Sequence, residues 1–384
     1  MNKPTQLTEI HHSGKPYIIY KSKKGFDLYT NFSKKIILNN KNIKSFLGKK
    51  YKGKTKNTDL FIGFFGYQLL NNLINVKVPK QNSVNFPKGI FYKPEKIINL
   101  SNNLNYKSDK IIKNRKFRIN INKNSYTKIF DKFKRKIKSG ETYQIKICTK
   151  YKIKSEINSL DFFSRLSKTN LAPEAFMIRD KNYSIISCSP ENLITKKGSY
   201  ISTKPIAGTV KKTKSLNKMK ALKYFKKNIK ETKEHNMIVD MERNDLSRIC
   251  KVGSVKLYKQ KIIEEYKDLF HYVSLIKGKL KKDIKNIDII KAMMPGGSVI
   301  GCPKINTLNL LNKQEKENRN IYTGSFGYIK FNGDMRFNII IRSILNFKKL
   351  SEISVASGVV VDSNANHEFN ENYIKAKALI DLFK

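Results

Sequence analysis

The chain has 384 residues, of which 78 are Lys or Arg and 30 are Asp or Glu, so its formal net charge is +48. The length is sufficient for one large domain or two moderate ones. The longest apolar run, over residues 60–70, has eleven residues and is too short to cross a bilayer as a helix. With no hydrophobic targeting segment in the first residues, we expect a soluble, cytoplasmic protein without a membrane partner.

The high positive charge is compatible with a nucleic-acid partner, because basic proteins gain affinity by displacing counterions from phosphates. Only 10 of the 78 basic residues are Arg, however, and Arg is the usual choice for bidentate recognition of phosphates and bases. The Lys residues are spread along the whole chain among many Asn and Ile. This pattern indicates a drift in composition, and we expect no nucleic-acid partner.

The cysteines give no sign of a disulfide framework or a zinc site. Cys148, Cys188, Cys250 and Cys302 are far apart in the sequence and form no CxxC pair. This usage is typical of a protein in a reducing compartment.

The first third of the chain has a weak pattern. Residues 1–60 are polar and lysine-rich, and we interpret them as a shortened N-terminal region of unclear role, followed by one domain over residues 61–384. The apolar run 60–70 is typical of a strand. Over residues 126–140, apolar side chains recur at helical spacing and the segment ends in Gly140, which predicts a helix.

The rest of the chain alternates between strand and helix patterns. Strands are predicted over 142–153, 172–180, 183–194, 197–212 (with a turn at Pro205 and Gly208), 253–266, 269–280 and 351–363. Helices are predicted over 216–248 and from about residue 366. Residues 322–344 are predicted to form a hairpin that turns at Asn332–Gly333. Because several strands are joined by hairpins, we do not expect a purely parallel sheet.

Two predicted helices each carry a pair of acidic residues. Glu231 and Glu234 are three residues apart and share a helix face, as do Glu368 and Glu371. Two such pairs could surround a hard cation with the oxygen ligands that Mg²⁺ or Ca²⁺ requires. Taken alone, the motif is weak, and two solvated faces paired with the abundant Lys explain it better.

The segment 294–305 combines three glycines with the start of a helix, which is a natural cradle for an anionic group. It is not a P-loop, because Gly301 is followed by Cys and Pro instead of Lys and Ser or Thr. The alternative is a tight strand-to-helix turn. Lys304 is then either an anion ligand or a surface lysine.

Two further residues are candidates of unequal weight. His271 lies in the apolar run LFHYVSLI, and a lone His in such a run is more often a satisfied core residue than a catalyst. Arg342 ends the apolar run FNIIIRSI, where a guanidinium requires either an anionic partner or an exposed end. Arg342 is therefore the better ligand candidate.

The order of these segments resembles that of the chorismate-utilising enzymes, which include anthranilate synthase component I, aminodeoxychorismate synthase component I, and the isochorismate and salicylate synthases. The match runs from about residue 61 to 380 through the blocks GFFGY, SGETYQIKIC, SCSPEN, STKPIAGT, KETKEHNMIVDMERNDLSRIC, FHYVS, PGGSVIGCPK, YTGSFGYI, IIIRSI and ASGVVVDS…HEFNENYIKAKAL. The resemblance implies an α+β fold in which two β-sheets pack face to face with helices outside, and a catalytic domain over residues 61–384.

The resemblance also implies a cofactor. In this family the two acidic helices hold Mg²⁺, which binds the ring carboxylate of chorismate. Glu234 and Glu371 match the metal ligands, and Glu231 and Glu368 support them directly or through water.

Six residues match positions that bind the substrate in the family. Tyr328, Arg342 and the backbone of Gly358 match positions that hold the enolpyruvyl carboxylate. The Ser298–Gly301 loop matches positions that line the ring, and Lys304 follows on the same loop.

Five residues match positions that take part in the chemistry. Glu191 matches the residue proposed to protonate the departing C4 hydroxyl, which makes physical sense because hydroxide is a poor leaving group. His271 matches a position beside the ring, and Thr209 matches the hydroxyl of the PIxGT motif. Gln144 and Ala207 stand at positions that distinguish the branches of the family.

The branch positions favour an aminating enzyme. Gln144 stands where the isochorismate and salicylate enzymes carry a lysine that activates water, and Gln cannot act as that base. Ala207 is the anthranilate-type residue, whereas many aminodeoxychorismate synthases carry a lysine there. The blocks NLAPEAF, PGGSVIGCPK, ERND and YTGSFGY lean toward aminodeoxychorismate synthase component I. We therefore predict that function, in 4-aminobenzoate and folate synthesis.

Two alternatives remain open. The first is anthranilate synthase component I, in which nitrogen enters at C2 and pyruvate is eliminated. The second is a basic binding protein that has lost catalysis, which the intact set of four glutamates argues against. Because the chain shows no glutamine-hydrolysing Cys–His machinery, the ammonia is expected to come from a separate glutamine amidotransferase subunit.

Overall fold

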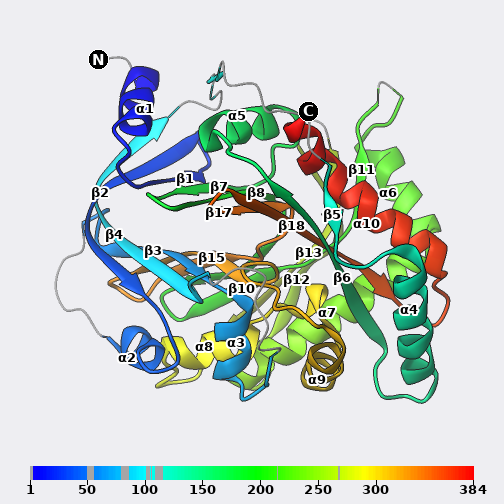
Figure 1. Ribbon diagram of the computed structural model, residues 1–384. Helices are drawn as coiled ribbons and strands as arrows, with labels where there is room; N and C mark the ends of the chain where they lie inside the picture. Colours follow the sequence, from blue (N-terminus) through cyan, green and yellow to red (C-terminus); the bar gives the residue numbers. More distant parts are fainter. Residues whose placement is uncertain are drawn as a thin grey trace.

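The structure, a computed structural model, describes residues 3–49, 56–78, 86–100, 104, 106–108, 116–213, 215–266 and 269–384. Its central feature is one 18-stranded sheet with helices around it (Figure 1). The strands are β1 (Tyr17–Lys21), β2 (Phe26–Ile37), β3 (Leu60–Phe65), β4 (Gly89–Leu100), β5 (Arg118–Ile119), β6 (Gln144–Lys154), β7 (Glu174–Arg179), β8 (Tyr183–Ser189), β9 (Asn192–Lys197), β10 (Tyr200–Lys204), β11 (Ile206–Lys211), β12 (Lys256–Glu265), β13 (Leu269–Lys279), β14 (Gly301–Cys302), β15 (Ser325–Lys330), β16 (Met335–Asn338), β17 (Ser343–Phe347) and β18 (Leu350–Val359).

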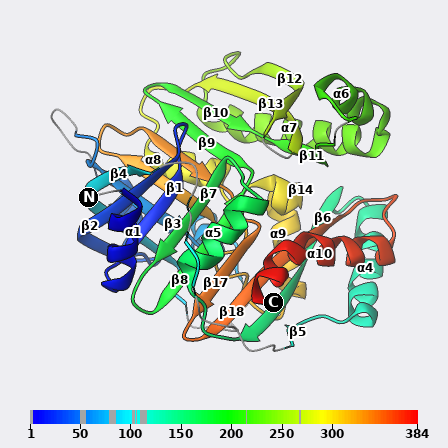
Figure 2. The same cartoon turned by 90° about the horizontal axis from the view of Figure 1, so that it is seen from above.

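The helices cover the outer surfaces of this sheet. The α-helices are α1 (Lys3–His12), α2 (Ile43–Gly48), α3 (Tyr67–Leu73), α4 (Lys123–Lys138), α5 (Ser159–Thr169), α6 (Lys218–Lys227), α7 (Ile229–Ile249), α8 (Asn286–Met293), α9 (Lys304–Gln314) and α10 (Ala365–Ile380), and the 3₁₀ helices are η1 (Gly297–Val299) and η2 (Asp381–Phe383). Figure 2 shows α6 and α7 beside β11–β13, and α4 and α10 beside β6. No helix in the described ranges is both long enough and apolar enough to cross a membrane.

Every strand pair in the described sheet is antiparallel. Following the hydrogen bonds, the order is β12, β13, β10 with β11, β9, β16, β15, β3, β4, β2, β1, β7, β8, β17, β18 and β6, and both β14 and β5 pair with the far side of β6. The described part of the N-terminal region contributes β1 and β2 to this sheet. The expected absence of a purely parallel sheet is confirmed.

The sheet curls so that distant strands pack against each other. The rings of Phe176 in β7 and Phe326 in β15 stack with centroids 3.8 Å apart, although these strands are not hydrogen-bonded neighbours. They belong to an apolar cluster that also contains Ile18, Ile62 and Ile185. Two separate sheets packed face to face are not confirmed, since hydrogen bonds connect the described strands into one curled sheet.

Most of the predicted elements are confirmed. The helix predicted over 126–140 is α4, which buries Tyr126 and Phe133 and begins after Asn122, whose side chain accepts a hydrogen bond from the Ser125 N–H. The hairpin β15–β16 turns at Asn332–Gly333, as expected from the left-handed backbone that glycine tolerates there. The apolar run 60–70 is only partly a strand, because β3 ends at Phe65 and α3 follows.

Two predicted elements are interrupted. The helix predicted over 216–248 is two helices, α6 and α7, which meet at Asn228. Asn228 accepts a hydrogen bond from the Glu231 N–H at 3.1 Å and so starts α7 as its N-cap. The strand predicted over 197–212 is divided at Pro205, where a turn was predicted, because Pro205 has no N–H to donate. The turn predicted at Gly208 is wrong, because β11 continues through it.

Candidate active site

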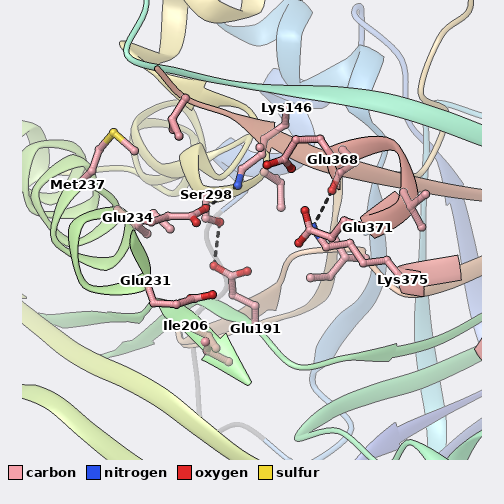
Figure 3. Close-up of a pocket in the computed structure, with 18 of the residues that line it drawn as sticks. Lys146, Glu191, Ile206, Glu231, Glu234, Met237, Ser298, Glu368, Glu371 and Lys375 are labelled. Carbon is pink, nitrogen blue, oxygen red and sulfur yellow. Dashed lines mark hydrogen bonds and ion pairs between the residues drawn. The ribbon is translucent and has the colours of Figure 1, made fainter. Parts of the chain in front are cut away.

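One cavity of about 790 Å³ collects residues from segments that are far apart in the sequence. Its walls come from β6, α7, β18, α10 and the segment that contains η1 (Figure 3). Eight of the predicted site residues line it: Glu191, Glu231, Glu234, Ser298, Arg342, Gly358, Glu368 and Glu371.

The four glutamates enter the cavity from two helices on opposite sides. Glu231 and Glu234 belong to α7, and Glu368 and Glu371 belong to α10 (Figure 3). Each acidic pair lies near the N-terminus of its helix, where the helix dipole favours negative charge. Asn364 accepts hydrogen bonds from the backbone of the first turn of α10, as Asn228 does for α7. The two N-caps therefore determine where each helix begins, and with it the position of the acidic pair on that helix.

Glu234 is held by two donors from β6. The Gln144 amide and the Lys146 ammonium each donate a hydrogen bond to the same oxygen, Oε1, at 2.8 Å. Burial by itself would raise the pKa of Glu234, but Lys146 and Gln144 outweigh it and lower the pKa to about 2. Glu234 is therefore an anion at any physiological pH.

The carboxylates of α10 have a lysine of their own. Lys375 forms an ion pair with Glu371 at 3.1 Å, one helical turn away. Glu368 is 1% exposed and also interacts with Glu371. Although burial opposes ionisation, Lys375 and Glu368 help to hold the pKa of Glu371 below its usual value. Glu234 and Glu371, one from each acidic pair, are thus each partly neutralised by a lysine inside the cavity.

Glu191 is a buried carboxyl at the link between β8 and β9. The Ser298 hydroxyl donates a hydrogen bond to Glu191 Oε1 at 2.8 Å. Burial raises the pKa of Glu191 to about 7, with Ser298, Lys146 and Arg342 opposing that rise. Glu191 can therefore hold a proton near neutral pH, a suitable state for a general acid.

Arg342 lies directly before β17, beside the chain segment that carries Glu191. The Ile339 N–H donates to the Glu191 carbonyl at 3.1 Å, and the Cys188 N–H donates to the Arg342 carbonyl at 3.2 Å. Arg342 makes no ion pair with any residue in the described ranges, and burial lowers its pKa. A half-buried guanidinium that lines a cavity without a carboxylate partner in the described ranges is suited to bind an anionic ligand.

Gly358 brings the backbone of β18 close to Lys146. A Cβ atom at this position would lie 2.6 Å from Lys146 Nζ and 3.1 Å from Gln144 Nε2. Any larger residue would therefore displace the two donors that hold Glu234. The backbone of Gly358 stays accessible from the cavity.

Apart from Ala207 and Thr209, whose side chains are not described, five predicted residues lie outside the cavity lining: Gln144, His271, Gly301, Lys304 and Tyr328. Tyr328 points toward Tyr20, with ring centroids 6.5 Å apart. Lys304 is buried, forms an ion pair with Asp245 at 2.5 Å and donates to the Ala292 carbonyl. His271 is 1% exposed, and burial lowers its pKa to about 4, so it is a neutral core histidine.

Gly301, another of these residues, has a structural reason to be glycine. Its φ is +130°, and a Cβ atom there would lie 2.0 Å from the Gln144 carbonyl. Gly301 therefore allows β14 to pair with β6 and helps to position Gln144, which is buried behind Glu234. Ala207 and Thr209 lie in β11, where their side chains are outside the described part of the structure.

Lys146, Lys375 and Tyr322 are among the lining residues that were not predicted. Lys146 follows Gln144 by two residues, and that spacing in a strand already indicates the same face. Lys375 follows Glu371 by four residues, which indicates the same face of a helix. Tyr322 is the tyrosine of the YTGSFGY block that lines the cavity, six residues before Tyr328. No local pattern distinguishes these two tyrosines.

The donor chemistry fits a hard divalent cation, since carboxylate oxygens are the ligands that Mg²⁺ prefers. The donors are not gathered, however: in the described residues no three His, Cys, Asp or Glu side chains are close enough together to hold a metal ion. Instead, Glu234 and Glu371 are each paired with a lysine. The cavity thus contains suitable ligands, but their side chains are paired with lysines and are not gathered at one point as a metal ion would require.

Comparisons with known proteins identify the family of the chain. A family model described as chorismate binding enzyme matches residues 7–381. The aminodeoxychorismate synthase component 1 of Bacillus subtilis (strain 168) is 35% identical over 255 residues, which cover 66% of this chain and 54% of that protein. The anthranilate synthase component 1 of Arthrobacter globiformis is 36% identical over 263 residues, which cover 67% of this chain and 50% of that protein.

This chain therefore spans about half the length of these two relatives. The crystal structure of anthranilate synthase component I from Streptococcus pneumoniae TIGR4 has the same fold, with a TM-score of 0.76 at 24% identity over 96% of this chain and 92% of that chain. With the family match covering nearly the whole sequence, the chain belongs to the family of chorismate binding enzymes.

Proposed function

We propose that the chain is an aminodeoxychorismate synthase component I, which converts chorismate and ammonia into 4-amino-4-deoxychorismate for 4-aminobenzoate and folate synthesis. The observation that carries the proposal is the cavity itself. It combines a buried carboxyl with a pKa of about 7, an arginine without a carboxylate partner in the described ranges, and four glutamates. These are groups suited to a dicarboxylate substrate that must lose a hydroxyl.

Substrate orientation follows from the charges on the two sides of the cavity. Arg342 and the backbone of Gly358 offer donors to one carboxylate of the substrate. The glutamates of α7 and α10 repel a bare carboxylate, so that side requires a cation. Mg²⁺ held by Glu234, Glu371 and their neighbours Glu231 and Glu368 would supply the positive charge for the second carboxylate.

Glu191 is suited to help the C4 hydroxyl leave. In its protonated form it can donate a proton to that hydroxyl, which then departs as water instead of hydroxide. The Ser298 hydroxyl orients the carboxyl by its hydrogen bond to Oε1. Burial keeps the proton on Glu191 up to about pH 7.

The residues of the cavity support ammonia over water as the nucleophile. Activation of water requires a base, and the amide of Gln144 cannot accept a proton at this pH. Lys146 lies near the same position, but Glu234, Glu371 and Glu368 overcome the effect of burial and raise its pKa above its usual value. A lysine that stays protonated is not a base, whereas ammonia needs no activation.

The nitrogen donor is proposed to be ammonia from a glutamine amidotransferase subunit. The relatives described above carry the names component 1 of aminodeoxychorismate synthase and of anthranilate synthase. Such names are consistent with a second component, which would deliver ammonia to this cavity.

Anthranilate synthase component I remains the second candidate, because Ala207 is the residue typical of that branch and the relatives of the two branches are about equally similar. In that case nitrogen enters at C2, and this chain also eliminates pyruvate.

Product identification tests the proposal. Purified protein is supplied with chorismate, Mg²⁺ and an ammonium salt, with and without aminodeoxychorismate lyase, and the products are separated by chromatography. We expect 4-aminobenzoate only when the lyase is present. Fluorescent anthranilate formed without the lyase would instead assign the chain to the second candidate, and unchanged chorismate in both reactions would reject both.

A further inference from the structure

Lys146 is a cation built into the wall of the cavity. It lies on β6 with its side chain 11% exposed, and its ammonium reaches between the acidic pairs of α7 and α10 (Figure 3). Within the described residues, Glu234 is the one carboxylate at ion-pair distance from Lys146, with 2.8 Å between Nζ and Oε1. Glu371 and Glu368 are near enough to act on its charge.

A divalent cation and this ammonium would use the same carboxylate. Glu234 Oε1 already accepts hydrogen bonds from both Lys146 and Gln144. A metal ion that binds Glu234 must share the carboxylate with a positive charge a few ångströms away, or displace it. Because a nearly buried ammonium is costly without an anionic partner, displacement requires another anion for Lys146.

We propose that Lys146 is a positioning residue that couples metal binding to substrate binding. Without substrate, Lys146 forms an ion pair with Glu234 and competes with the divalent cation for that carboxylate. A substrate carboxylate in the cavity offers Lys146 a second anionic partner, so Glu234 becomes available to the cation. The arrangement explains why the four glutamates line one cavity and yet are not gathered into a metal cluster. It rests on the proposed use of a divalent cation and of chorismate by this site.

The test is a Mn²⁺ titration of the 384-residue chain, followed by the electron paramagnetic resonance of free Mn²⁺ with and without chorismate. No nitrogen donor is added, so that the aminating reaction does not consume the substrate. In the unaltered protein, chorismate is expected to tighten Mn²⁺ binding. Lys146→Met is expected to bind Mn²⁺ about tenfold more tightly without chorismate and to gain less from its addition, because the two ligands are linked through the lysine.

Two control variants make the result specific. Lys233 of α7 also lines the cavity, is exposed and forms no ion pair with any described residue, so Lys233→Met removes the same charge without releasing a glutamate. It is expected to change Mn²⁺ affinity much less, since exposed charges are screened by water and salt. Lys146→Arg keeps the charge and is expected to keep the weak binding and the coupling.

The proposal is overturned if Lys146→Met binds Mn²⁺ no more tightly than the unaltered protein or Lys233→Met, or if no variant binds Mn²⁺. A circular dichroism melting curve of each variant identifies misfolding. If Lys146→Met is misfolded, Mn²⁺ binding is compared between Lys146→Arg and Lys146→Gln instead. Because the readout is metal binding, it is independent of which product the enzyme forms. A failure of the proposed function would therefore appear in the product assay and not in this titration.

Discussion

Glu191 is the residue whose environment most directly determines a measurable rate. Its pKa of about 7 means that the proton-donating form predominates below pH 7 and is lost as the pH rises through that value. We expect the turnover rate to fall above about pH 7. Glu191→Gln is expected to reduce turnover by about 100-fold to 10,000-fold, the usual contribution of a general acid.

The pH profile of Ser298→Ala provides the matched control. The hydrogen bond from Ser298 lowers the pKa of Glu191, so its removal is expected to raise that pKa and to move the falling limb to higher pH. Steady-state rates between pH 5 and 9 would measure both effects. A Glu191→Gln enzyme that keeps its rate and its pH profile would remove Glu191 from the mechanism.

Arg342 is expected to determine affinity more than rate. Replacing it by Met removes the guanidinium that faces the cavity without a carboxylate partner in the described ranges, and should weaken chorismate binding by about tenfold or more, since charge-assisted hydrogen bonds are the strong ones. Arg342→Lys should recover part of this loss, because it keeps the charge but not the planar fork. Isothermal titration calorimetry measures both variants. Equal affinity of Met and Arg at this position would contradict the assignment.

At the scale of the helices, the N-cap of α7 connects stability with the site. Asn228 and Asn122 each accept a hydrogen bond from a backbone N–H three residues later, at 3.1 Å and 2.9 Å, at the starts of α7 and α4. Replacing either by Ala is expected to lower the free energy of unfolding by about 1 kcal/mol. Only Asn228→Ala should also weaken chorismate binding, because α7 carries Glu231 and Glu234 and α4 carries no lining residue.

Urea denaturation and calorimetry of the two variants separate these effects. Equal losses of stability with unequal losses of affinity are the expected outcome. If both variants bind chorismate equally well, then the start of α7 does not position the glutamates.

At the scale of the whole molecule, the curled sheet determines which residues meet. β6 and β18 pair along ten residues, which places Lys146 of one strand opposite Gly358 of the other. β14, which follows Ser298 in the chain, pairs with the other edge of β6, and α10 comes directly after β18 in the sequence. A protein with a formal net charge of +48 thereby concentrates four glutamates in one cavity, where two lysines partly neutralise them.

Local patterns in the sequence determined many of the elements of this protein. The helix α4, the hairpin at Asn332–Gly333 and the acidic pairs on α7 and α10 follow from spacings of a few residues, which depend only on the geometry of one helix or one turn. The order of the motif blocks was sufficient to indicate the family, and the family match confirmed it.

The tertiary structure alone decided which candidates share a cavity. Tyr322 lines it and Tyr328 does not, and Lys146 reaches Glu234, 88 residues away in sequence. The two expected sheets are not confirmed, because hydrogen bonds between distant segments connect the described strands into one sheet. The break at Asn228 also exceeds what periodicity can predict, since a single cap interrupts a helical pattern that otherwise continues. Contacts between distant segments depend on tertiary packing, and packing cannot be inferred from a short window of sequence.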